Sequence, residues 1–303
     1  MSSPSGLPPP APAFPPIALS VLIAGVPDVR ARGDVGISVL DVVHDARAVT
    51  PGALFCCVVG ERADGHEFAR SALGAGAAAL LVERWLDLPA TQVLVPSVRR
   101  AMGPVAALAF REPASSMTML GVTGTNGKTT TTYLLDAIAR RAGHRVGRIG
   151  TTGAMSAGMP VRVERTTPEA PDLHRVLARM RDDGVGLVAM EVSSHALAQH
   201  RVGGLVFDAA AFTNLSQDHL DFHPSMEAYF AAQARLFDGR CPRAVNADDP
   251  WGRRLAAELR YGLGSSDDGR LADVRAEDVE LRADGTAFRL VTPAGVRAVR
   301  TPL

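Results

Sequence analysis

The stretch "GVTGTNGKTTTT", residues 121–132, carries the strongest indication of fold class in the chain. A strict P-loop has the pattern G-x-x-x-x-G-K-[ST], in which glycines allow backbone N–H groups to surround phosphates. Counted back from Gly127, Lys128 and Thr129, the first glycine of that pattern falls on Val122, and the glycine stands at Gly124 instead. The stretch therefore departs from the strict pattern by the place of one glycine, while the lysine and the hydroxyl keep their positions.

The flanks of this stretch agree with a phosphate-binding loop. Residues 117–123 form an apolar, β-branched run that predicts a buried strand, and residues 129–141 predict a helix. A strand, a glycine turn and a helix N-terminus together make an anion site, because the first N–H groups of the helix point at the ligand. A glycine-rich turn without a ligand is the simpler alternative, but it leaves the placement of the glycines, the lysine and the hydroxyl unexplained.

Length and composition limit the classes of protein to consider. A chain of 303 residues is long enough for two domains. The 32 Lys and Arg residues balance the 32 Asp and Glu residues, which gives no electrostatic reason to expect a nucleic acid or an anionic membrane as partner. No apolar run approaches the ~20 residues of a membrane span. The odd cysteine count, Cys56, Cys57 and Cys241, lacks metal-ligand spacing. We expect a cytoplasmic protein with reduced cysteines, and a monomer.

The order of apolar and polar segments predicts an α/β protein with two domains. Residues 1–18, rich in Pro and Ser, are expected to be a disordered tail, and residues 19–113 alternate short strands with alanine-rich helices. After a linker at 112–116, the part 117–303 predicts a doubly wound, mostly parallel sheet that binds ligands beyond the carboxyl ends of its strands. Its strands are expected near residues 118–123, 145–150, 186–192, 207–215 and 243–248.

The last part of the chain has a different pattern. The segment "DVELRADGTAFRLVTPAGVRAV" has turn signals at Asp284-Gly285 and at residues 293–295, between segments in which apolar and polar residues alternate. Alternation bounded by such turns predicts antiparallel hairpins. We therefore expect the central sheet to end in antiparallel strands.

An acidic side chain ends one of the predicted strands. Glu191 lies in "AMEVSSHALAQHR", residues 189–201, directly after an apolar run. In a doubly wound sheet this strand end faces the same crevice as the phosphate loop, so Glu191 and the hydroxyl of Thr129 are candidate Mg²⁺ ligands. A solvated residue at the rim of the sheet is the alternative, and for Glu191 considered alone it is the commoner case.

The segment "TNLSQDHLDFH", residues 213–223, follows the next predicted strand and places Asp218, His219, Asp221 and His223 within six residues. Such a cluster suits a polar site with one imidazole on a metal ion. We favour His219 as that ligand. Asp221 and His223 are more simply explained by a loop that is capped by its own aspartates.

The segment "VNADDP", residues 245–250, ends a further strand with an amide and two carboxylates. Asn246 and Asp249 can hydrogen-bond a base and a ribose. Asp249 is equally well placed as the N-cap of a helix that starts near Pro250, and the two roles are compatible.

Taken together and in this order, "GVTGTNGKTTTT", "TTPEAPDL", "MEVSSHALAQHRV", "FTNLSQDHLDFH" and "NADDP" resemble the Mur ligases, and most closely the MurE type, which adds the third residue of the peptidoglycan stem peptide. The resemblance runs from about residue 40 to residue 303, and the displaced glycine is this family's own form of the loop. It implies ATP and Mg²⁺, with UDP-N-acetylmuramoyl-L-alanyl-D-glutamate and a diamino acid as substrates. In such a family the γ-phosphate of ATP goes to a substrate carboxylate, and an amine then displaces it.

The resemblance also implies roles for individual residues. It implies catalytic roles for Lys128, Glu191 and His219, with Lys128 neutralising charge on the transferring group. One Mg²⁺ is carried over to Thr129 and Glu191, and a second to His219 with Glu191. The ATP site is carried over to Gly124, Thr125, Asn126, Gly127, Lys128, Thr129, Thr130, Asn246 and Asp249. The site for the UDP precursor is carried over to Asp45, Arg47, Thr166, Thr167, Ser193, Gln199 and Arg201.

Three departures from the family's pattern limit what the resemblance implies. The family's Asp-Ser-Arg motif is Asp45-Ala46-Arg47 here, so one hydroxyl that could contact the nucleotide is missing. In "MEAYFAAQARLF", residues 226–237, the family has a lysine, modified to a carbamate that binds the second Mg²⁺, where this chain has Gln233. Family members continue into a third domain with further ATP contacts and the pocket for the incoming amino acid. We expect this C-terminal ligase domain to be absent here, so the residues do not indicate which amino acid is added.

Three functions follow from these observations. The first is an ATP-dependent ligase that activates the γ-carboxylate of the precursor as an acyl phosphate. The second is a remnant that binds nucleotide or precursor without turnover. The third is a folate-glutamate ligase, which has a similar loop. Against the third stand "TTPEAP", "MEVSSHALAQHR" and a first domain of uridine-site type.

Overall fold

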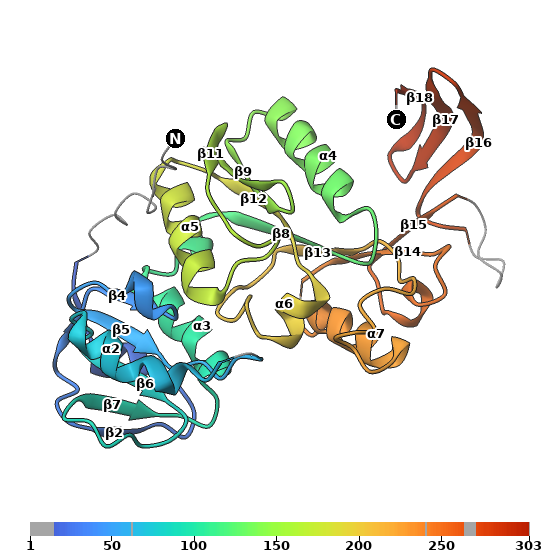
Figure 1. Cartoon of the computed structure of the whole chain (residues 1–303). Coiled ribbons are helices and arrows are strands. Elements are labelled where there is room, and N and C mark those ends of the chain that lie inside the picture. Colours follow the sequence, from blue (N-terminus) through green and yellow to red (C-terminus); the bar gives the residue numbers. More distant parts are fainter. Residues whose placement is uncertain (1–14, 62, 240, 264–270, 303) are drawn as a thin grey trace, which may run out of the picture.

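Two main sheets organise the chain, an eleven-stranded sheet and a five-stranded sheet, with a separate two-stranded ribbon (Figure 1). The computed structural model describes residues 15–61, 63–239, 241–263 and 271–302. We call the part around the smaller sheet, residues 15–111, the N-terminal unit, and the part around the larger sheet, residues 117–302, the central unit. Both units combine parallel strands with helices, so the predicted α/β class is confirmed.

The sheet of the N-terminal unit has the order β2-β7-β6-β5-β4. Its strands β4 to β7 run parallel, and β2 is added antiparallel at the edge. The strands are β2 (Arg30–Arg32), β4 (Asp41–Val43), β5 (Ala53–Cys56), β6 (Ala79–Val82) and β7 (Thr91–Leu94). The helices are α1 (Leu19–Ile23), η1 (Ala46–Ala48), η2 (Gly65–Phe68), α2 (Ala69–Gly74) and α3 (Val98–Ala109). Strands β5 and β6 are apolar and fully buried, as expected for strands that are covered on both faces.

The start of the N-terminal unit corrects one prediction. Ile17 and Ala18, which we expected in the disordered tail, form strand β1 (Ile17–Ala18) and pair antiparallel with β3 (Ser38–Val39). The apolar residues that follow explain this, since Leu19 and Leu22 are fully buried in the core of the unit and hold the segment in place. Residues 1–14 of the predicted tail lie outside the described residues.

The sheet of the central unit has the order β11-β10-β9-β12-β8-β13-β14-β15-β16-β17-β18. The strands from β9 to β16 run parallel, and antiparallel strands are added at both edges. The parallel strands are β8 (Thr118–Thr123), β9 (Val146–Gly150), β12 (Leu187–Glu191), β13 (Ala209–Phe212), β14 (Arg243–Asn246), β15 (Leu259–Gly262) and β16 (Val274–Arg282). The antiparallel strands are β10 (Gly153–Ser156), β11 (Met159–Val161), β17 (Gly285–Thr292) and β18 (Gly295–Thr301).

The predicted strands of the central unit and its antiparallel end are therefore confirmed, as β8, β9, β12, β13, β14 and the ribbon β16–β18. The antiparallel pair at the other edge, β10 and β11, was not predicted. The linker expected at 112–116 is not extended, because η3 (Pro113–Ser116) forms a 3₁₀ turn there and packs against α5. The division of the chain at residues 113 and 117 stays a prediction.

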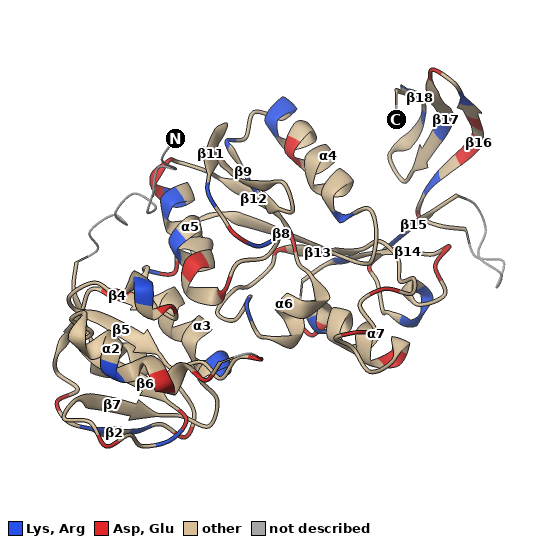
Figure 2. Cartoon of the chain, in the orientation of Figure 1, with Lys and Arg blue, Asp and Glu red and all other residues tan. Residues whose placement is uncertain are grey.

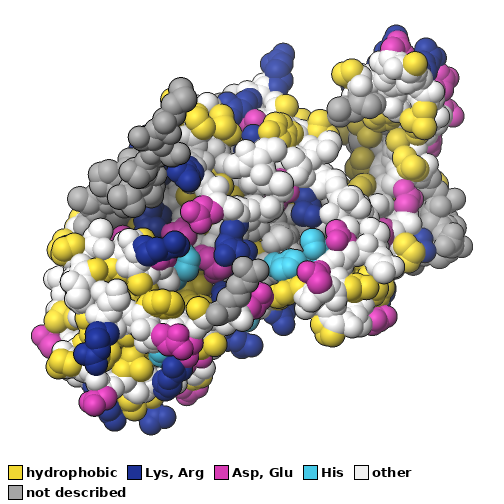
Figure 3. Space-filling view, in the orientation of Figure 1, with side chains coloured by type: hydrophobic (Ala, Val, Ile, Leu, Met, Phe, Trp, Pro, Cys, Tyr) yellow, Lys and Arg dark blue, Asp and Glu magenta, His cyan; other side chains and the backbone are white. Residues whose placement is uncertain are grey.

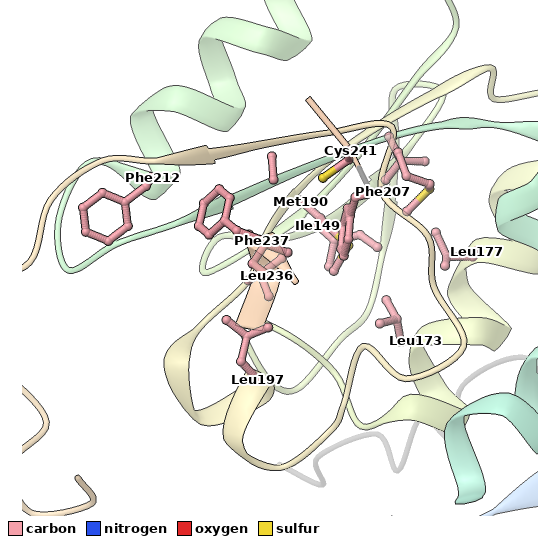
Figure 4. Packing of buried hydrophobic residues seen from close by; sticks show 14 of the residues in the cluster. Ile149, Leu173, Leu177, Met190, Leu197, Phe207, Phe212, Leu236, Phe237 and Cys241 are labelled. Carbon is pink, nitrogen blue, oxygen red and sulfur yellow. The ribbon is translucent and has the colours of Figure 1, made fainter. Parts of the chain in front are cut away.

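Helices cover both faces of the central sheet (Figure 1). Helix α4 (Lys128–Arg141) lies on one face, and α6 (Ser194–Ala198) and α7 (Met226–Ala234) lie on the other, followed by η4 (Arg235–Phe237). The short turn η5 (Gly252–Arg254) joins β14 to β15. Figure 4 shows the core on the side of α6 and α7, where Ile149 and Phe207 meet Leu236 and Phe237. Among the described residues, no helix is both long and apolar enough to span a membrane.

Helix α5 (Ala170–Asp182) joins the cores of the two units. Leu173, Leu177 and Met180 follow the spacing of one helical face and pack into the core of the central unit. Ala170 and Ala178 lie on another face and pack into the core of the N-terminal unit. The small size of these alanines lets α3 approach α5, and the two helices are in direct contact. The position of the N-terminal unit relative to the central sheet therefore depends on α5.

A second close approach between the units involves Gly103, in the middle of α3. A Cβ atom added at Gly103 would lie 2.6 Å from the carbonyl oxygen of Gly203 and 2.8 Å from its Cα atom. Both neighbours are backbone atoms of the turn that follows α6, so they cannot rotate away. The carbonyl of Gly203 is held in addition by His174 Nε2 on α5, at 2.9 Å. Burial lowers the pKa of this histidine to about 4, so it stays neutral at neutral pH.

We predict that Gly103→Ala destabilises the chain by about 1–3 kcal/mol, because the added methyl group forces α3 away from the turn at Gly203. Gly74→Ala is the matched control, since Gly74 also lies in a helix and an added Cβ meets no atom within 4 Å. The control should be neutral or stabilising by up to ~1 kcal/mol, because alanine favours helices over glycine. Thermal unfolding of both variants measures the difference. A Gly103→Ala variant that melts at the same temperature as the wild type would show that the contact between α3 and this turn does not stabilise the fold.

Candidate functional site

The loop between β8 and α4 forms the centre of the candidate site. Strand β8 ends at Thr123, and α4 begins at Lys128 with Gly127 as its N-cap in the left-handed region, at φ 85°. Gly124 has φ 136°, and a Cβ there would lie 1.9 Å from Thr213 Oγ1. Only glycine fits this position, because both the backbone conformation and the neighbouring strand exclude a side chain.

The loop is held by the segment that follows β13. The amide N–H of Thr125 donates to the carbonyl of Asn214 at 2.8 Å, and that of Asn126 donates to Asn214 Oδ1 at 3.0 Å. Thr213 Oγ1 donates to the carbonyl of Asn126 at 2.6 Å. From α7, the hydroxyl of Tyr229 lies 3.1 Å from Thr125 Oγ1. These contacts with neighbouring segments hold the loop in its shape.

The side chain of Lys128 bonds back to the backbone of the loop. Its Nζ atom donates to the carbonyl oxygens of Gly124 at 2.6 Å and Thr125 at 2.8 Å. Burial lowers the pKa of this amine, and the charges of Glu191 and Asp218 oppose that shift. Lys128 is also the only lysine among the 32 Lys and Arg residues of the chain. A compact ammonium group fits between two carbonyls where a planar guanidinium would not.

Glu191 lies beside the loop at the end of β12, as predicted. Its side chain is fully buried, and Oε1 accepts from the backbone N–H of Thr151 at 3.0 Å while Oε2 accepts from Thr151 Oγ1 at 3.1 Å. Because the residue is buried, the interpretation as a solvated rim residue is wrong. A carboxylate and a hydroxyl at one pocket are a suitable start for a Mg²⁺ site, so Glu191 and Thr129 fit the first metal ion.

A pocket of about 240 Å³ opens between this loop and Glu191. It has a basic group at one side and a carboxylate at the other, and its floor is the N-terminus of α4. The first free N–H groups of this 14-residue helix favour an anion there. The lining residues are Thr125, Asn126, Gly127, Lys128, Thr129, Thr130, Thr151 and Glu191.

His219 does not join these residues. It does not line the pocket, and the nearest acidic group is that of its neighbour Asp218, at 3.6 Å. Its ring lies edge-on to that of His195, with the ring centres 4.8 Å apart. His223, which we expected not to be a ligand, is buried and lies 2.9 Å from Ser194 Oγ through Nε2. Within the described ranges, no three His, Cys, Asp or Glu side chains form a group that could hold a metal ion. The residues therefore do not fit a second Mg²⁺ site in this structure.

Gln233, at which the resemblance places the family's modified lysine, lies on α7. Its side chain is fully buried, and neither its amide oxygen nor its amide nitrogen has a hydrogen bond of ordinary geometry. Burial raises the pKa of Tyr229, on the same helix, while Thr125 and Gln233 oppose that shift. A buried amide without partners costs free energy, and it offers one neutral oxygen where a carbamate offers a negative charge.

Asn246 and Asp249 hydrogen-bond the segment after β13 that holds the loop. Asn246 Nδ2 donates to the carbonyl of Thr213 at 2.8 Å, and Asp249 Oδ2 accepts from the N–H of Leu215 at 3.1 Å. Asp249 Oδ1 accepts from the N–H groups of Trp251 and Gly252, at 2.9 and 3.0 Å. Asp249 thus caps the turn before η5 (Gly252–Arg254), but the N-cap residue of η5 is Trp251, so the predicted N-cap role of Asp249 is not confirmed. Contact of either residue with a nucleotide stays a prediction.

The predicted precursor-binding residues of the central unit lie together next to Glu191. Thr166 Oγ1 is 3.2 Å from Thr151 Oγ1, and Thr167 Oγ1 donates to the carbonyl of Glu191 at 2.8 Å. Arg201 donates to the carbonyl of Thr167 at 3.3 Å. These short contacts place the threonine pair between the pocket and the N-terminal unit.

Two further predicted residues, Ser193 and Gln199, flank α6. Ser193 N–H donates to Thr167 Oγ1 at 3.1 Å, and its own Oγ accepts from Ala196 N at 3.2 Å as the N-cap of α6. Gln199 Oε1 accepts from Arg201 Nη2 at 2.5 Å. The side chains of both residues are thus already engaged with protein partners in this structure.

Asp45 and Arg47 lie apart from this group, on the N-terminal unit. Asp45 caps the turn η1 and accepts from Arg47 Nη2 at 2.6 Å, and this bond lowers the pKa of Asp45. The same pairing with Asp45 raises the pKa of Arg47.

Residues that the sequence analysis missed complete the site. Thr151 binds both carboxylate oxygens of Glu191, and Asn214 and Tyr229 hold the loop. Thr151 follows the predicted strand at 145–150 directly, so the rule that led to Glu191 also indicates Thr151. Tyr229 has no such signal, because it comes from a helix that is distant in sequence.

Basic and acidic residues are interspersed along the described parts of both units (Figure 2). On the face shown in Figure 3, basic, acidic and histidine side chains gather in the middle of the molecule, between the N-terminal unit and the central sheet. The pocket and the threonine pair are continuous with each other, because Thr166 lies beside Thr151, which lines the pocket.

Comparison with known proteins agrees with this geometry. Residues 122–303 match the family model "Mur ligase middle domain", and residues 39–111 match "Mur ligase family, catalytic domain". A protein of Geobacillus thermodenitrificans (strain NG80-2), named UDP-N-acetylmuramoyl-L-alanyl-D-glutamate–2,6-diaminopimelate ligase, is 44% identical over 273 residues, which are 86% of this chain and 55% of that protein. One of Geobacter sulfurreducens with the same name is 42% identical over 286 residues, 89% of this chain and 55% of that protein.

A solved structure of a protein with that name superposes with a TM-score of 0.81 at 27% identity, over 95% of this chain and 60% of the other. The chain thus spans about half the length of the curated relatives it matches. The middle-domain model alone matches more than half of the residues, from 122 to 303, and the chain belongs to the Mur ligase family.

Proposed function

We propose that the protein works as an ATP-dependent ligase of peptidoglycan precursor synthesis, which adds the third amino acid to UDP-N-acetylmuramoyl-L-alanyl-D-glutamate. The observation that carries the proposal is the pocket in which Lys128, Thr129 and Glu191 meet at the N-terminus of α4. Beside it, Thr166 and Thr167 contact Thr151 and Glu191 of the pocket. The relatives of 42% to 44% identity bear the name of this ligase activity.

The proposed reaction has two steps. The γ-phosphoryl group of ATP passes to the γ-carboxylate of the precursor's D-glutamate, which leaves ADP and an acyl phosphate. The amine of a diamino acid then attacks the acyl carbon, and phosphate leaves as the amide forms. A bound Mg²⁺ would neutralise charge on the phosphates. Phosphoryl transfer depends mainly on positioning and charge stabilisation, which are the functions that the residues of this pocket can supply.

Each residue of the pocket has a separate task in this proposal. The N–H groups of the first turn of α4 bind the phosphate oxygens, because those of Thr125 and Asn126 already donate to Asn214. Lys128 exchanges its contacts with the carbonyls of Gly124 and Thr125 for contacts with the transferring phosphate. Thr129 and Glu191 would hold the Mg²⁺, with Thr151 fixing the orientation of the carboxylate.

We predict that Lys128→Ala weakens the binding of Mg²⁺–ATP by ~1.5–3 kcal/mol, the contribution of a charge-assisted hydrogen bond. Arg141→Ala, which removes one positive charge at the other end of α4, is the matched control and should leave the affinity within about twofold, because exposed charges at this distance are screened. Calorimetric titration measures both. The same affinity in the wild type and in Lys128→Ala would contradict the assignment of this loop to ATP binding.

The single lysine permits a second measurement on the unaltered chain. An amine-reactive reagent can modify only Lys128 and the amino terminus. Mg²⁺–ATP should protect Lys128 and not the amino terminus, as measured by mass spectrometry of the peptides. Equal labelling of Lys128 with and without the nucleotide would contradict the proposed contact.

A binding remnant with little turnover is the second candidate function, and Gln233 is the observation that favours it. With an amide in place of a carbamate, a second Mg²⁺ would lack its charged ligand, and the moving phosphoryl group would lose one of its counter-ions. Under this proposal ATP binds, but the transfer of its γ-phosphoryl group is slow.

We predict that, in a fusion of the chain to the C-terminal part of a relative, turnover needs Gln233→Lys. ADP release that depends on UDP-N-acetylmuramoyl-dipeptide is measured for four proteins, the chain alone and its fusion to that part, each with and without Gln233→Lys. Release should be strong only in the substituted fusion. Strong release from the unaltered chain would refute the remnant, and strong release from the fusion that keeps Gln233 would show that Gln233 is tolerated.

Other parts of the function remain our proposals. We expect a diamino acid as the second substrate, work in the cytoplasm and a monomeric state, with neither nucleic acid nor membrane as partner. The balanced charge supports the last point, since the 32 Lys and Arg residues equal the 32 Asp and Glu residues in number.

A further inference from the structure

A chain of charged side chains crosses from the N-terminal unit to the predicted precursor site. Glu169, the residue before α5, is 6% exposed and lies between two arginines. Its Oε2 accepts from Arg99 Nη1 at 3.2 Å, and Arg99 belongs to α3 of the N-terminal unit. Its Oε1 lies 3.1 Å from Nε of Arg201, which follows α6. One buried carboxylate thus joins a cation from each unit.

Arg201 has little freedom beyond this contact. Nη1 donates to the carbonyl of Thr167 at 3.3 Å and Nη2 to Gln199 Oε1 at 2.5 Å, while Nε faces Glu169 without an aligned hydrogen bond. The residue is 7% exposed, and burial lowers the pKa of its guanidinium while Glu169 opposes that shift. Arg201 therefore holds Thr167 and Gln199 in place, and Glu169 supplies its counter-charge.

The chain of contacts returns to the N-terminal unit on its other side. Gln199 Nε2 donates to Glu61 Oε1 at 3.2 Å, and Glu61 is exposed. The buried half of the network, through Glu169, is the part that water cannot replace, because a buried guanidinium without a counter-ion is strongly unfavourable. Neither Arg99 nor Glu169 lines the nucleotide pocket. The network thus touches predicted precursor residues without touching the ATP loop.

We infer that Glu169 is a positioning residue for the precursor, one that fixes Arg201, and through it Thr167 and Gln199, in the geometry the precursor meets when it binds between the two units. The inference rests on the proposed function for the identity of the precursor. It assigns no contact between Glu169 and the substrate. Its consequence is that Glu169 affects precursor binding and leaves ATP binding unchanged, since the loop at 124–130 is held by other contacts.

The test uses Glu169→Gln, which keeps the size of the side chain but turns an amide NH₂ group toward one of two arginines that are themselves donors. Glu169→Asp, which keeps the charge and withdraws it by one methylene, is the second variant. Asp41→Asn is the matched control, because Asp41 also pairs with an arginine across the units, at 2.7 Å from Arg175 Nη2, and within the described part of the chain forms no hydrogen bond or ion pair with Thr167, Gln199 or Arg201.

Three quantities are measured for each protein: the affinity for UDP-N-acetylmuramoyl-dipeptide, the affinity for Mg²⁺–ATP, and the NMR signal of the Arg201 Nε–H group, assigned with Arg201→Lys. Glu169→Gln should shift this signal, speed its exchange with water, and weaken precursor binding by about tenfold or more. ATP affinity should stay within about twofold. Glu169→Asp should follow in the same direction to a smaller extent, and Asp41→Asn should match the wild type.

The outcomes separate this inference from the proposed function. Precursor affinity that is the same in wild type and both Glu169 variants would overturn the inference, as would an unchanged Arg201 signal. A parallel loss of precursor and ATP affinity would reduce Glu169 to a purely structural role and overturn it as well. A wild type that binds ATP but no precursor would refute the proposed substrate, and the shift of the Arg201 signal would then decide alone whether Glu169 positions Arg201.

Discussion

The parallel pairing of β8 with both of its neighbours is the constraint on which the rest of the site depends. In this register Glu191 of β12 stands opposite Val122, and Phe212 of β13 stands opposite Thr123. The carboxyl ends of the three strands therefore stop at the same level, so that Glu191, Gly124 and Thr213 meet where the chain turns into α4. A shift by one residue would turn Glu191 to the other face of the sheet. The loop at 124–127, the Glu191 carboxylate and the segment after β13 lie together because of this one alignment.

The junction between the two units depends on a different balance of forces. Along α5 the contact is apolar and close, because alanines face the N-terminal core and Gly103 of α3 packs directly on a backbone turn. Next to it lie buried charges, with Glu169 between two arginines. A dry contact beside a paired polar network holds the units in one relative position, since apolar packing tolerates sliding more readily than paired charges do. The predicted precursor residues lie at this junction, where both units contribute side chains.

Gln233 is one of the points at which the resemblance implies a departure from the family's pattern. Its burial without hydrogen-bond partners is unusual, because buried polar groups are nearly always paired. The surrounding structure, with Tyr229 bonded to the loop and His223 stacked on Tyr229, keeps a polar cluster under the phosphate loop. The first predicted Mg²⁺ site has suitable donors among the described residues, whereas the second does not.

Local patterns in the residues specify much of this protein. Alternating apolar and helical segments indicated the α/β class, the strands of the central sheet and its antiparallel end, because burial on both faces and turn residues leave signals within short windows. Glu191 was found by its place at a strand end. The tail at 17–18 was misjudged because the apolar residues that hold it follow in the sequence, and β10 and β11 are too short to give a signal. Other features depend on residues that are distant in sequence and carry no pattern of their own: Thr213 against Gly124, Tyr229 against Thr125, His219 turned toward His195, and Glu169 between Arg99 and Arg201. Such contacts arise only when strands pair and helices pack, so they belong to the tertiary structure, whereas the loop chemistry and the fold class were already present in the order of the residues.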